Sequence, residues 1–283
     1  MDNVSVAAIQ MVSGDDVGHN LARARLLIQQ AAAQGARLAL LPENFAHLAD
    51  RGSFAVAETY AADTAPDPQT QPIQAALRRY ARDFGIWLAA GAIPLRSRPD
   101  GTPTAAKRCR SAFLLFDEQG NERARYDKIH LFDVDVDDAA GSYRESNSIE
   151  PGEGLYVQET PFGHLGLSIC FDLRFPELYR QLAIAGAEIF MVPAAFTYTT
   201  GQAHWQTLLR ARAIENGCFV IAANQGGAHS SKRRTWGHSM IIDPWGDVLA
   251  EADEGEAVII ADLHGKKLEK VRKSMPLLSM RRL

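Results

Sequence analysis

The segment LALLPE, residues 38–43, decides the fold class of this chain. Its first four residues are all apolar, and so short an apolar run is typical of a strand buried on both faces. Sheets built from such strands are covered by helices. Glu43 follows at the carboxyl end of the strand, which is where α/β sheets place their ligands.

The segments around this strand alternate between strand and helix. Upstream, the sequence predicts an apolar strand at 4–10 and a helix at 20–34, with Asn20 as its N-cap. Downstream, it predicts a helix at 72–85 that begins with a proline and ends at a glycine, followed by a buried strand at 86–92. This order of elements predicts an α/β domain.

The rest of the chain adds hairpins and then returns to the same alternation. Turns rich in Gly and Pro separate three pairs of short strands, which predict hairpins at 111–126, 155–170 and 239–251. The polar residues 133–154 show no period. Because helices and strands alternate again from 176 to 223, we expect one α/β domain over residues 1–283, with a basic tail from about 263.

The architecture that fits best has two mixed sheets, each covered by helices on one side. The alternative is an ordinary doubly wound single sheet. No linker rich in Pro, Gly or Ser and no internal repeat divides the chain.

Composition excludes several classes of protein. Apolar residues make up 46% and charged residues 23% of the 283 residues, which excludes disordered, collagenous and coiled-coil chains. A net charge of −4 gives no basic field for nucleic acid or an anionic membrane. The most apolar stretch, 182–196, is interrupted by Glu188 and is too short to span a membrane.

The amino-terminal residues and the cysteines indicate the compartment. The chain begins without a basic segment followed by an apolar one, so we expect no signal peptide. The three cysteines are widely spaced and odd in number, which does not suit a disulfide framework. We therefore expect a cytoplasmic protein. No nucleotide-binding or zinc-binding motif is present, so we expect no cofactor and no metal.

Cys170 is the first candidate for chemistry. It ends the apolar stretch 164–169, and Pro176 soon afterwards is well placed to start a helix. A side chain in such a strand-to-helix turn is presented outward. The alternative is a buried structural cysteine, because free cysteine packs as a small hydrophobe.

Glu43 and Lys128 also follow strands, and together with Cys170 they supply the parts that acyl transfer needs. A thiol is mostly protonated at neutral pH, so a base must take its proton. A cation is then needed where the oxyanion of the tetrahedral intermediate develops. Taken one at a time, Glu43 could be a loop carboxylate and Lys128 a surface lysine, but the set predicts a thiol hydrolase.

Three motifs in this order resemble the nitrilase superfamily, the carbon–nitrogen hydrolases. They are LPE at 41–43, YDKIHL at 126–131 and CFDLRFPE at 170–177, and the similarity extends over nearly the whole chain. The resemblance implies a four-layer α-β-β-α sandwich with two mixed sheets and helices on the outer faces. It also implies a homodimer or higher homo-oligomer joined through helices.

The resemblance also implies a role for each residue of the site. Glu43 would be the general base, Cys170 the nucleophile and Lys128 the oxyanion stabiliser, with the backbone N–H of Phe171 as a second oxyanion donor. Glu145 would assist by positioning Lys128 or the attacking water. Otherwise Glu145 is a surface carboxylate. Phe171 stands where the family commonly has tyrosine, which affects the polarity of the pocket.

Further segments, 145–152, 203–216 and 237–246, resemble the branch that hydrolyses deaminated glutathione to 2-oxoglutarate and Cys-Gly. The alternatives within the enzyme class are an ω-amidase acting on 2-oxoglutaramate, a nitrilase and an N-carbamoyl amidohydrolase. The alternative from another class is a catalytically silent binding or assembly module.

A 2-oxo acid substrate carries a carboxylate, so the pocket should hold a cation. The resemblance makes Arg174 the candidate, and its planar guanidinium suits a carboxylate. The alternative is a structural ion pair of Arg174 with Asp172 or Glu177. Phe196 and Thr200 should line the pocket. The loop at 230–236 matches the basic loop of that branch only in part, and its Lys-Arg-Arg run could be solvated.

Overall fold

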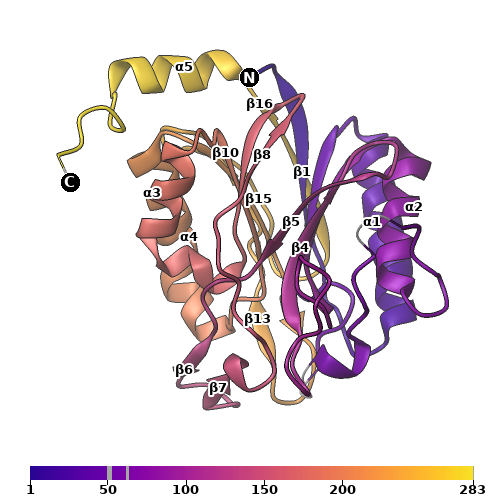
Figure 1. Ribbon diagram of the computed structural model, residues 1–283. Coiled ribbons are helices and arrows are strands. Elements are labelled where there is room, and N and C mark those ends of the chain that lie inside the picture. The colour runs from indigo at the N-terminus through magenta and orange to yellow at the C-terminus, as the bar shows by residue number, and fades with distance from the viewer. Residues whose placement is uncertain (50–52, 62–63, 283) are drawn as a thin grey trace.

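The computed structural model describes residues 1–49, 53–61 and 64–282. Two six-stranded mixed sheets pack face to face, and helices cover the outer face of each (Figure 1). The protein is therefore the four-layer α-β-β-α sandwich that the resemblance predicts. The single-sheet alternative is wrong.

The first sheet carries the segment 38–43 near its centre. α1 (Val17–Ala33) and α2 (Pro72–Phe84) cover its outer face. In spatial order, its strands are β16 (Ala257–Leu263), β1 (Val4–Gln10), β2 (Leu38–Leu41), β3 (Trp87–Leu95), β4 (Arg110–Phe116) and β5 (Glu122–Asp127).

The second sheet lies on the other side of the central core. α3 (Pro176–Ile184) and α4 (Tyr198–Asn216) cover its outer face. In spatial order, its strands are β15 (Val248–Glu251), β14 (Met240–Ile242), β11 (Phe219–Asn224), β10 (Ile189–Ala194), β9 (Gly163–Leu167) and β8 (Val157–Thr160).

The two sheets approach closely at Gly91 in β3. A Cβ atom built there would lie 2.4 Å from Cβ of Pro193 in β10 and 2.5 Å from the carbonyl oxygen of Leu41. No side chain fits in so small a space, so glycine is required by close approach. This contact lies beside the end of β2, immediately before Glu43.

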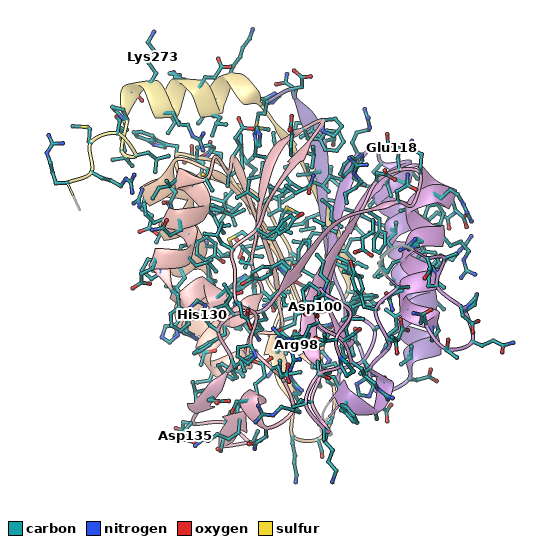
Figure 2. All side chains as sticks on the ribbon, viewed as in Figure 1. Arg98, Asp100, Glu118, His130, Asp135 and Lys273 are labelled. Atoms are coloured by element: carbon teal, nitrogen blue, oxygen red, sulfur yellow. The ribbon has the colours of Figure 1, made fainter. Side chains whose placement is uncertain are left out.

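Smaller elements gather at one end of the sandwich. They include β6 and β7, which form a hairpin, and β12 and β13, which form another. Figure 2 places His130 and Asp135 toward this end, with Glu118 and Lys273 toward the other. The bounds are β6 (Asp133–Asp135), β7 (Ser142–Arg144), β12 (Gly226–Ala228), β13 (Arg234–Trp236), and the 3₁₀ helices η1 (Ser53–Val56), η2 (Glu145–Asn147) and η3 (Cys170–Arg174).

The structure corrects the predicted cap of the first helix. α1 begins at Val17, and the side chain of Asp16 accepts the capping hydrogen bond from the His19 N–H at 3.0 Å. Asn20 lies inside the helix, buried, where its amide bonds the backbone of Gly14 and Ala46. Asn20 therefore anchors the segments on either side of α1 instead of capping it.

Two other parts of the chain differ from expectation. The stretch 133–154, which shows no period in sequence, forms the β6–β7 hairpin and η2. The basic tail contains the helix α5 (Gly265–Ser274), which crosses one end of the sandwich beside the N-terminus (Figure 1). Among the described residues, no helix combines the length and apolar content that a membrane crossing requires.

Candidate active site

Lys128 is the centre of the polar cluster that the sequence predicts. Its Nζ lies 2.9 Å from Oε1 of Glu43 and 2.9 Å from both carboxylate oxygens of Glu145. Its side chain is only 2% exposed, so its ammonium group is removed from bulk water. The structure thus brings together three residues that lie far apart in sequence, held by strand ends of the first sheet and by η2.

Glu43 connects the two sheets. It follows β2 and Pro42, and its Oε2 accepts a hydrogen bond from the backbone N–H of Ala195 at 3.0 Å, just after β10 of the second sheet. Its own carbonyl accepts a bond from the side chain of Gln225 at the end of β11. These bonds fix the carboxylate between Lys128 and the second sheet.

Cys170 lies on the second-sheet side of the same cluster. β9 ends at Leu167, so Cys170 does not end the strand directly but begins η3, with a left-handed φ of 47°. Such a φ is unusual outside glycine and is often found at functional sites. The thiol lies close enough to the Glu43 carboxylate and to the backbone N–H of Ala195 for both to shift its pKa.

The surroundings of Cys170 keep its thiol protonated. Burial raises its pKa well above the ordinary value, and the negative charge of Glu43 raises it further, while Lys128 opposes both. A thiol in this state does not ionise by itself at neutral pH, so it needs a base within reach. Glu43 is the carboxylate whose charge acts most strongly on it.

The charges of Lys128 and Glu145 depend on each other. Burial lowers the pKa of Lys128, but the carboxylates of Glu145 and Glu43 and the nearby Cys170 raise it well above the ordinary value. Burial raises the pKa of Glu145, and Lys128 opposes that shift. Glu145 is further held by the backbone N–H of Phe132, which donates to its Oε2 at 2.7 Å. Lys128 is therefore a fixed cation between two carboxylates.

Asp172 joins the lysine segment to the cysteine turn, and sequence reasoning missed this role. Its buried carboxylate accepts bonds from the Tyr126 hydroxyl at 2.7 Å and from the Ile169 N–H at 2.9 Å. It also accepts from the backbone of His130 and lies 2.7 Å from the ring nitrogen of that residue. Tyr126 and His130 flank Lys128, and Ile169 precedes Cys170. All of these residues lie in or beside the motifs at 126–131 and 170–177, and this proximity to the motifs was the signal from which the role of Asp172 could have been predicted.

A cavity of about 300 Å³ opens beside the cluster. Glu43, Lys128, Glu145 and Cys170 all line it, so the polar cluster is reached from the cavity. Phe171, Phe196 and Thr200 also line it, as the sequence predicts. The rest of the wall includes Arg144 and Arg233 from the β6–β7 and β12–β13 hairpins.

The side chains of Phe171, Phe196 and Thr200 shape the wall by packing. The Phe171 ring packs edge-on against Phe132, and Phe196 is largely buried against Trp205. The Thr200 hydroxyl lies 2.8 Å from that of Thr197. Phe171 follows Cys170 directly, so its N–H belongs to the first turn of η3, where N–H groups have no partner within the helix.

Arg174 lines the cavity without an ion pair among the described residues. Its guanidinium lies over the rings of Phe196 at 5.2 Å and Phe171 at 5.8 Å, and its Nη1 lies 3.1 Å from Nδ1 of His204. The alternative in which it pairs with Asp172 or Glu177 is not found there, because the Asp172 oxygens are bonded elsewhere. Burial lowers the pKa of Arg174, which a bound anion would reverse.

The loop at 230–236 is not simply solvated, as the position of Arg233 shows. Lys232 and Arg234 are exposed, but Arg233 is partly buried and lines the cavity. In the part of the chain that the structure describes, no group of three or more His, Cys, Asp or Glu is arranged to hold a metal ion.

Comparisons with known proteins agree with this geometry. The carbon-nitrogen hydrolase family profile matches residues 5–273. A deaminated glutathione amidase from Yersinia enterocolitica is 43% identical, and the alignment covers 100% of this chain and 94% of that one.

Two solved structures extend the comparison. Saccharomyces cerevisiae Nit3, a member of branch 10 of the nitrilase superfamily, has a TM-score of 0.84 at 30% identity, covering 100% of this chain and 97% of that one. An amidase mutant from Nesterenkonia sp. AN1, whose structure shows Michael addition of acrylamide at its active site cysteine, has a TM-score of 0.75 at 28% identity, covering 96% and 98%.

Proposed function

The chain belongs to the carbon–nitrogen hydrolase family, and from that premise we propose that Cys170, Glu43 and Lys128 hydrolyse an amide bond. The observation that carries the proposal is Lys128, held at 2.9 Å from Glu43, with the buried Cys170 close enough to both for their charges to shift the pKa of its thiol. Nucleophile, base and cation thus meet at one wall of one cavity. The active-site cysteine of the Nesterenkonia amidase supports the first of these roles.

The first half of the reaction acylates Cys170. Glu43 takes the thiol proton, and the thiolate attacks the carbonyl carbon of the amide. The carbonyl oxygen becomes an oxyanion, which Lys128 and the backbone N–H of Phe171 stabilise. The C–N bond then breaks, Glu43 gives its proton to the leaving amine, and a thioester remains on Cys170.

The second half releases the acid. After the amine leaves, Glu43 takes a proton from water, and the resulting hydroxide attacks the thioester carbonyl. The same two donors stabilise the second oxyanion. The C–S bond breaks, the carboxylic acid leaves, and Glu43 returns the proton to the thiolate. Glu145 assists by holding the Lys128 ammonium toward the reacting carbon, through the two bonds at 2.9 Å.

For the substrate we propose deaminated glutathione, which is hydrolysed to 2-oxoglutarate and Cys-Gly. The name of the Yersinia relative supports this choice. So does Arg174, a cation on the cavity wall with no carboxylate partner in the described chain, which suits the carboxylate of a 2-oxo acid. Phe196 and Thr200 then bound the acyl part of the pocket.

A panel of amides tests the substrate. The kcat/KM for deaminated glutathione should exceed the values for 2-oxoglutaramate, N-carbamoyl-β-alanine and simple nitriles. A higher value for 2-oxoglutaramate would identify an ω-amidase instead. Absence of turnover with every amide, together with equally slow alkylation of Cys170 and Cys218 in intact-mass measurements, would favour a catalytically silent protein.

We further propose a cytoplasmic homodimer joined through helices. Support for the dimer comes from apolar side chains that remain exposed on and beside α3 and α4, namely Ile184, Ile214 and Trp245, which is 53% exposed. Light scattering after size-exclusion chromatography should give about twice the 31.0 kDa of one chain. A Trp245→Asp variant should shift that mass toward the monomer, and an unchanged mass would place the interface elsewhere.

A further inference from the structure

Three arginines line the cavity, and they differ in their partners. Arg144 is paired, since its Nη2 lies 2.9 Å from Oδ1 of Asp135. Arg174 and Arg233 line the cavity without a carboxylate at ion-pair distance in residues 1–49, 53–61 and 64–282. The cavity therefore presents two guanidinium groups whose charge the described protein does not neutralise.

Arg174 and Arg233 are held by different parts of the fold. Arg174 ends η3, which Cys170 begins, and its guanidinium lies 5.8 Å from the ring of Phe171, the residue after Cys170. Arg233 lies in the β12–β13 hairpin, and its Nη1 donates to the carbonyl of Ala49, beyond the end of β2, at 3.2 Å. Arg233 also lies near Tyr143 of the β6–β7 hairpin, and its positive charge acts to lower the pKa of the Tyr143 hydroxyl. One cation is thus beside the nucleophile and the other is among the hairpins.

The loop that carries Arg233 is fixed before any ligand arrives. The Arg233 N–H donates to the Ser230 hydroxyl at 3.1 Å, and its carbonyl accepts from the His229 N–H at 2.9 Å. The His229 ring in turn lies 2.7 Å from the carbonyl oxygen of Ser13 and 2.6 Å from the Thr235 hydroxyl. A charged donor held in place in this way loses little freedom when it binds an anion.

The proposed substrate has a carboxylate at each end of the scissile amide. One belongs to the 2-oxo acid that becomes the acyl group, and the other is the C-terminal carboxylate of the leaving Cys-Gly. We infer that Arg174 binds the first carboxylate and Arg233 the second. Arg233 is then the residue that selects an amide with an acidic dipeptide leaving group over the same acyl group bound to ammonia. This inference rests on the proposed function.

The assignment follows from where each cation lies. The acyl group becomes bonded to Cys170, so its carboxylate stays within reach of the cation beside that residue, Arg174. The leaving group lies on the other side of the scissile bond, so its carboxylate needs a second cation on the cavity wall, and Arg233, near Tyr143 of the β6–β7 hairpin, supplies one. A guanidinium matches a carboxylate through two parallel hydrogen bonds, which a lysine does not reproduce.

The test compares deaminated glutathione with its C-terminal amide and with 2-oxoglutaramate, in wild type and in Arg233→Gln. In wild type, KM should be about 10- to 100-fold higher for the C-terminal amide than for the free acid, as expected for one charge-assisted bidentate contact. In Arg233→Gln, the two KM values should become nearly equal. Turnover of 2-oxoglutaramate, which lacks the second carboxylate, should change less than twofold.

Two further variants serve as controls. Arg234→Gln removes the neighbouring cation, which pairs with Glu254 and lies outside the cavity, and it should leave the kinetics with all three substrates unchanged. Arg174→Lys should raise KM for all three, since each carries the 2-oxo acid end.

The outcomes distinguish a failure of the role of Arg233 from a failure of the proposed substrate. If wild type hydrolyses the free acid and the C-terminal amide equally well, the role of Arg233 is overturned while the proposed function stands. The same conclusion follows if Arg233→Gln impairs turnover of 2-oxoglutaramate as strongly. If wild type hydrolyses only 2-oxoglutaramate, the proposed substrate is wrong, and Arg233 has no second carboxylate to bind.

Discussion

The floor and the rim of the cavity are built in different ways. The floor consists of Glu43, Lys128 and Cys170, which lie just beyond strands of the two sheets and are at most 7% exposed. The rim consists of the β6–β7 and β12–β13 hairpins, which carry Arg144 and Arg233 and remain partly open to solvent. Glu43 and Lys128 are bonded to each other and Cys170 lies beside both, whereas each rim arginine is bonded mainly to its own surroundings.

This difference separates the residues that react with the amide from the residues that select the substrate. Bonds between the sheets fix the reacting groups, so the floor can serve any amide that enters the cavity. The rim hairpins hold Arg233, which we infer binds the carboxylate of the leaving group. Changes to the floor should therefore affect all substrates alike, and changes to the rim should affect substrates differently.

Removing the nucleophile should have the largest effect. Cys170→Ala should abolish turnover of every substrate while leaving the melting temperature nearly unchanged, because only a small side chain is lost. Cys170→Ser should also be almost inactive, since a hydroxyl is far harder to ionise than a thiol. The matched control is Cys218→Ala, another buried free cysteine but one outside the cavity, which should keep its activity. Loss of cooperative unfolding in Cys170→Ala would make this cysteine structural.

Replacing the base should have the next largest effect. Glu43→Gln keeps the shape of the side chain and removes the carboxylate, so kcat should fall by about 10²- to 10⁴-fold, the usual contribution of a positioned general base. Steady-state kinetics with two different amides should give the same factor for both. If more than about a tenth of the activity remains, Glu43 is not the base, and Glu145 becomes the candidate.

Weakening the hydrogen bonds of Asp172, which join the lysine segment to the cysteine turn, should have a smaller effect. Asp172→Asn replaces a buried carboxylate that accepts bonds from Tyr126 and from the segment before Cys170. We expect kcat to fall by about 10- to 100-fold, because a small displacement of a reacting group is costly. KM should stay nearly constant, and stability should fall by about 1–3 kcal/mol. An equal loss of stability in Tyr126→Phe with unchanged kcat would limit this carboxylate to a structural role.

The smallest effect concerns the rim and its dependence on pH. Burial lowers the pKa of His229 from 6.5 to about 4, so the folded protein keeps this ring neutral. The unfolded chain binds a proton below about 6.5 that the folded chain does not bind. The neutral His229 ring therefore makes its full contribution to the free energy of unfolding above about pH 6.5, and this contribution is lost as the pH falls toward 4.

Urea unfolding at several pH values measures this contribution. Wild type should lose stability more steeply between pH 6.5 and 4 than His229→Asn, which has no group to titrate at this position. His164→Asn, which removes a more exposed histidine on the second sheet, is the control. Identical slopes for wild type and His229→Asn would contradict the prediction.

The sequence predicted the floor better than the rim, and the reason is physical. Strands such as 38–41 are wholly apolar, so their position in a sheet is determined by burial, and the residues that follow them must meet at the strand ends. The rim forms from polar segments such as 133–154, in which no run of apolar residues marks the strands of the β6–β7 hairpin. Asp172 was missed for a related reason, because its partners are separated from it in sequence and only the fold brings them together.

Gly91 has a consequence for the site that goes beyond packing. In most sandwiches the spacing between sheets is set by side chains, which can adjust when a neighbour changes. Beside the end of β2, however, a Cβ at Gly91 would lie 2.4 Å from Cβ of Pro193 in the second sheet, so the backbone of β3 lies directly against the proline ring. The two sheets therefore meet with no room for adjustment immediately beside the segment that carries the base.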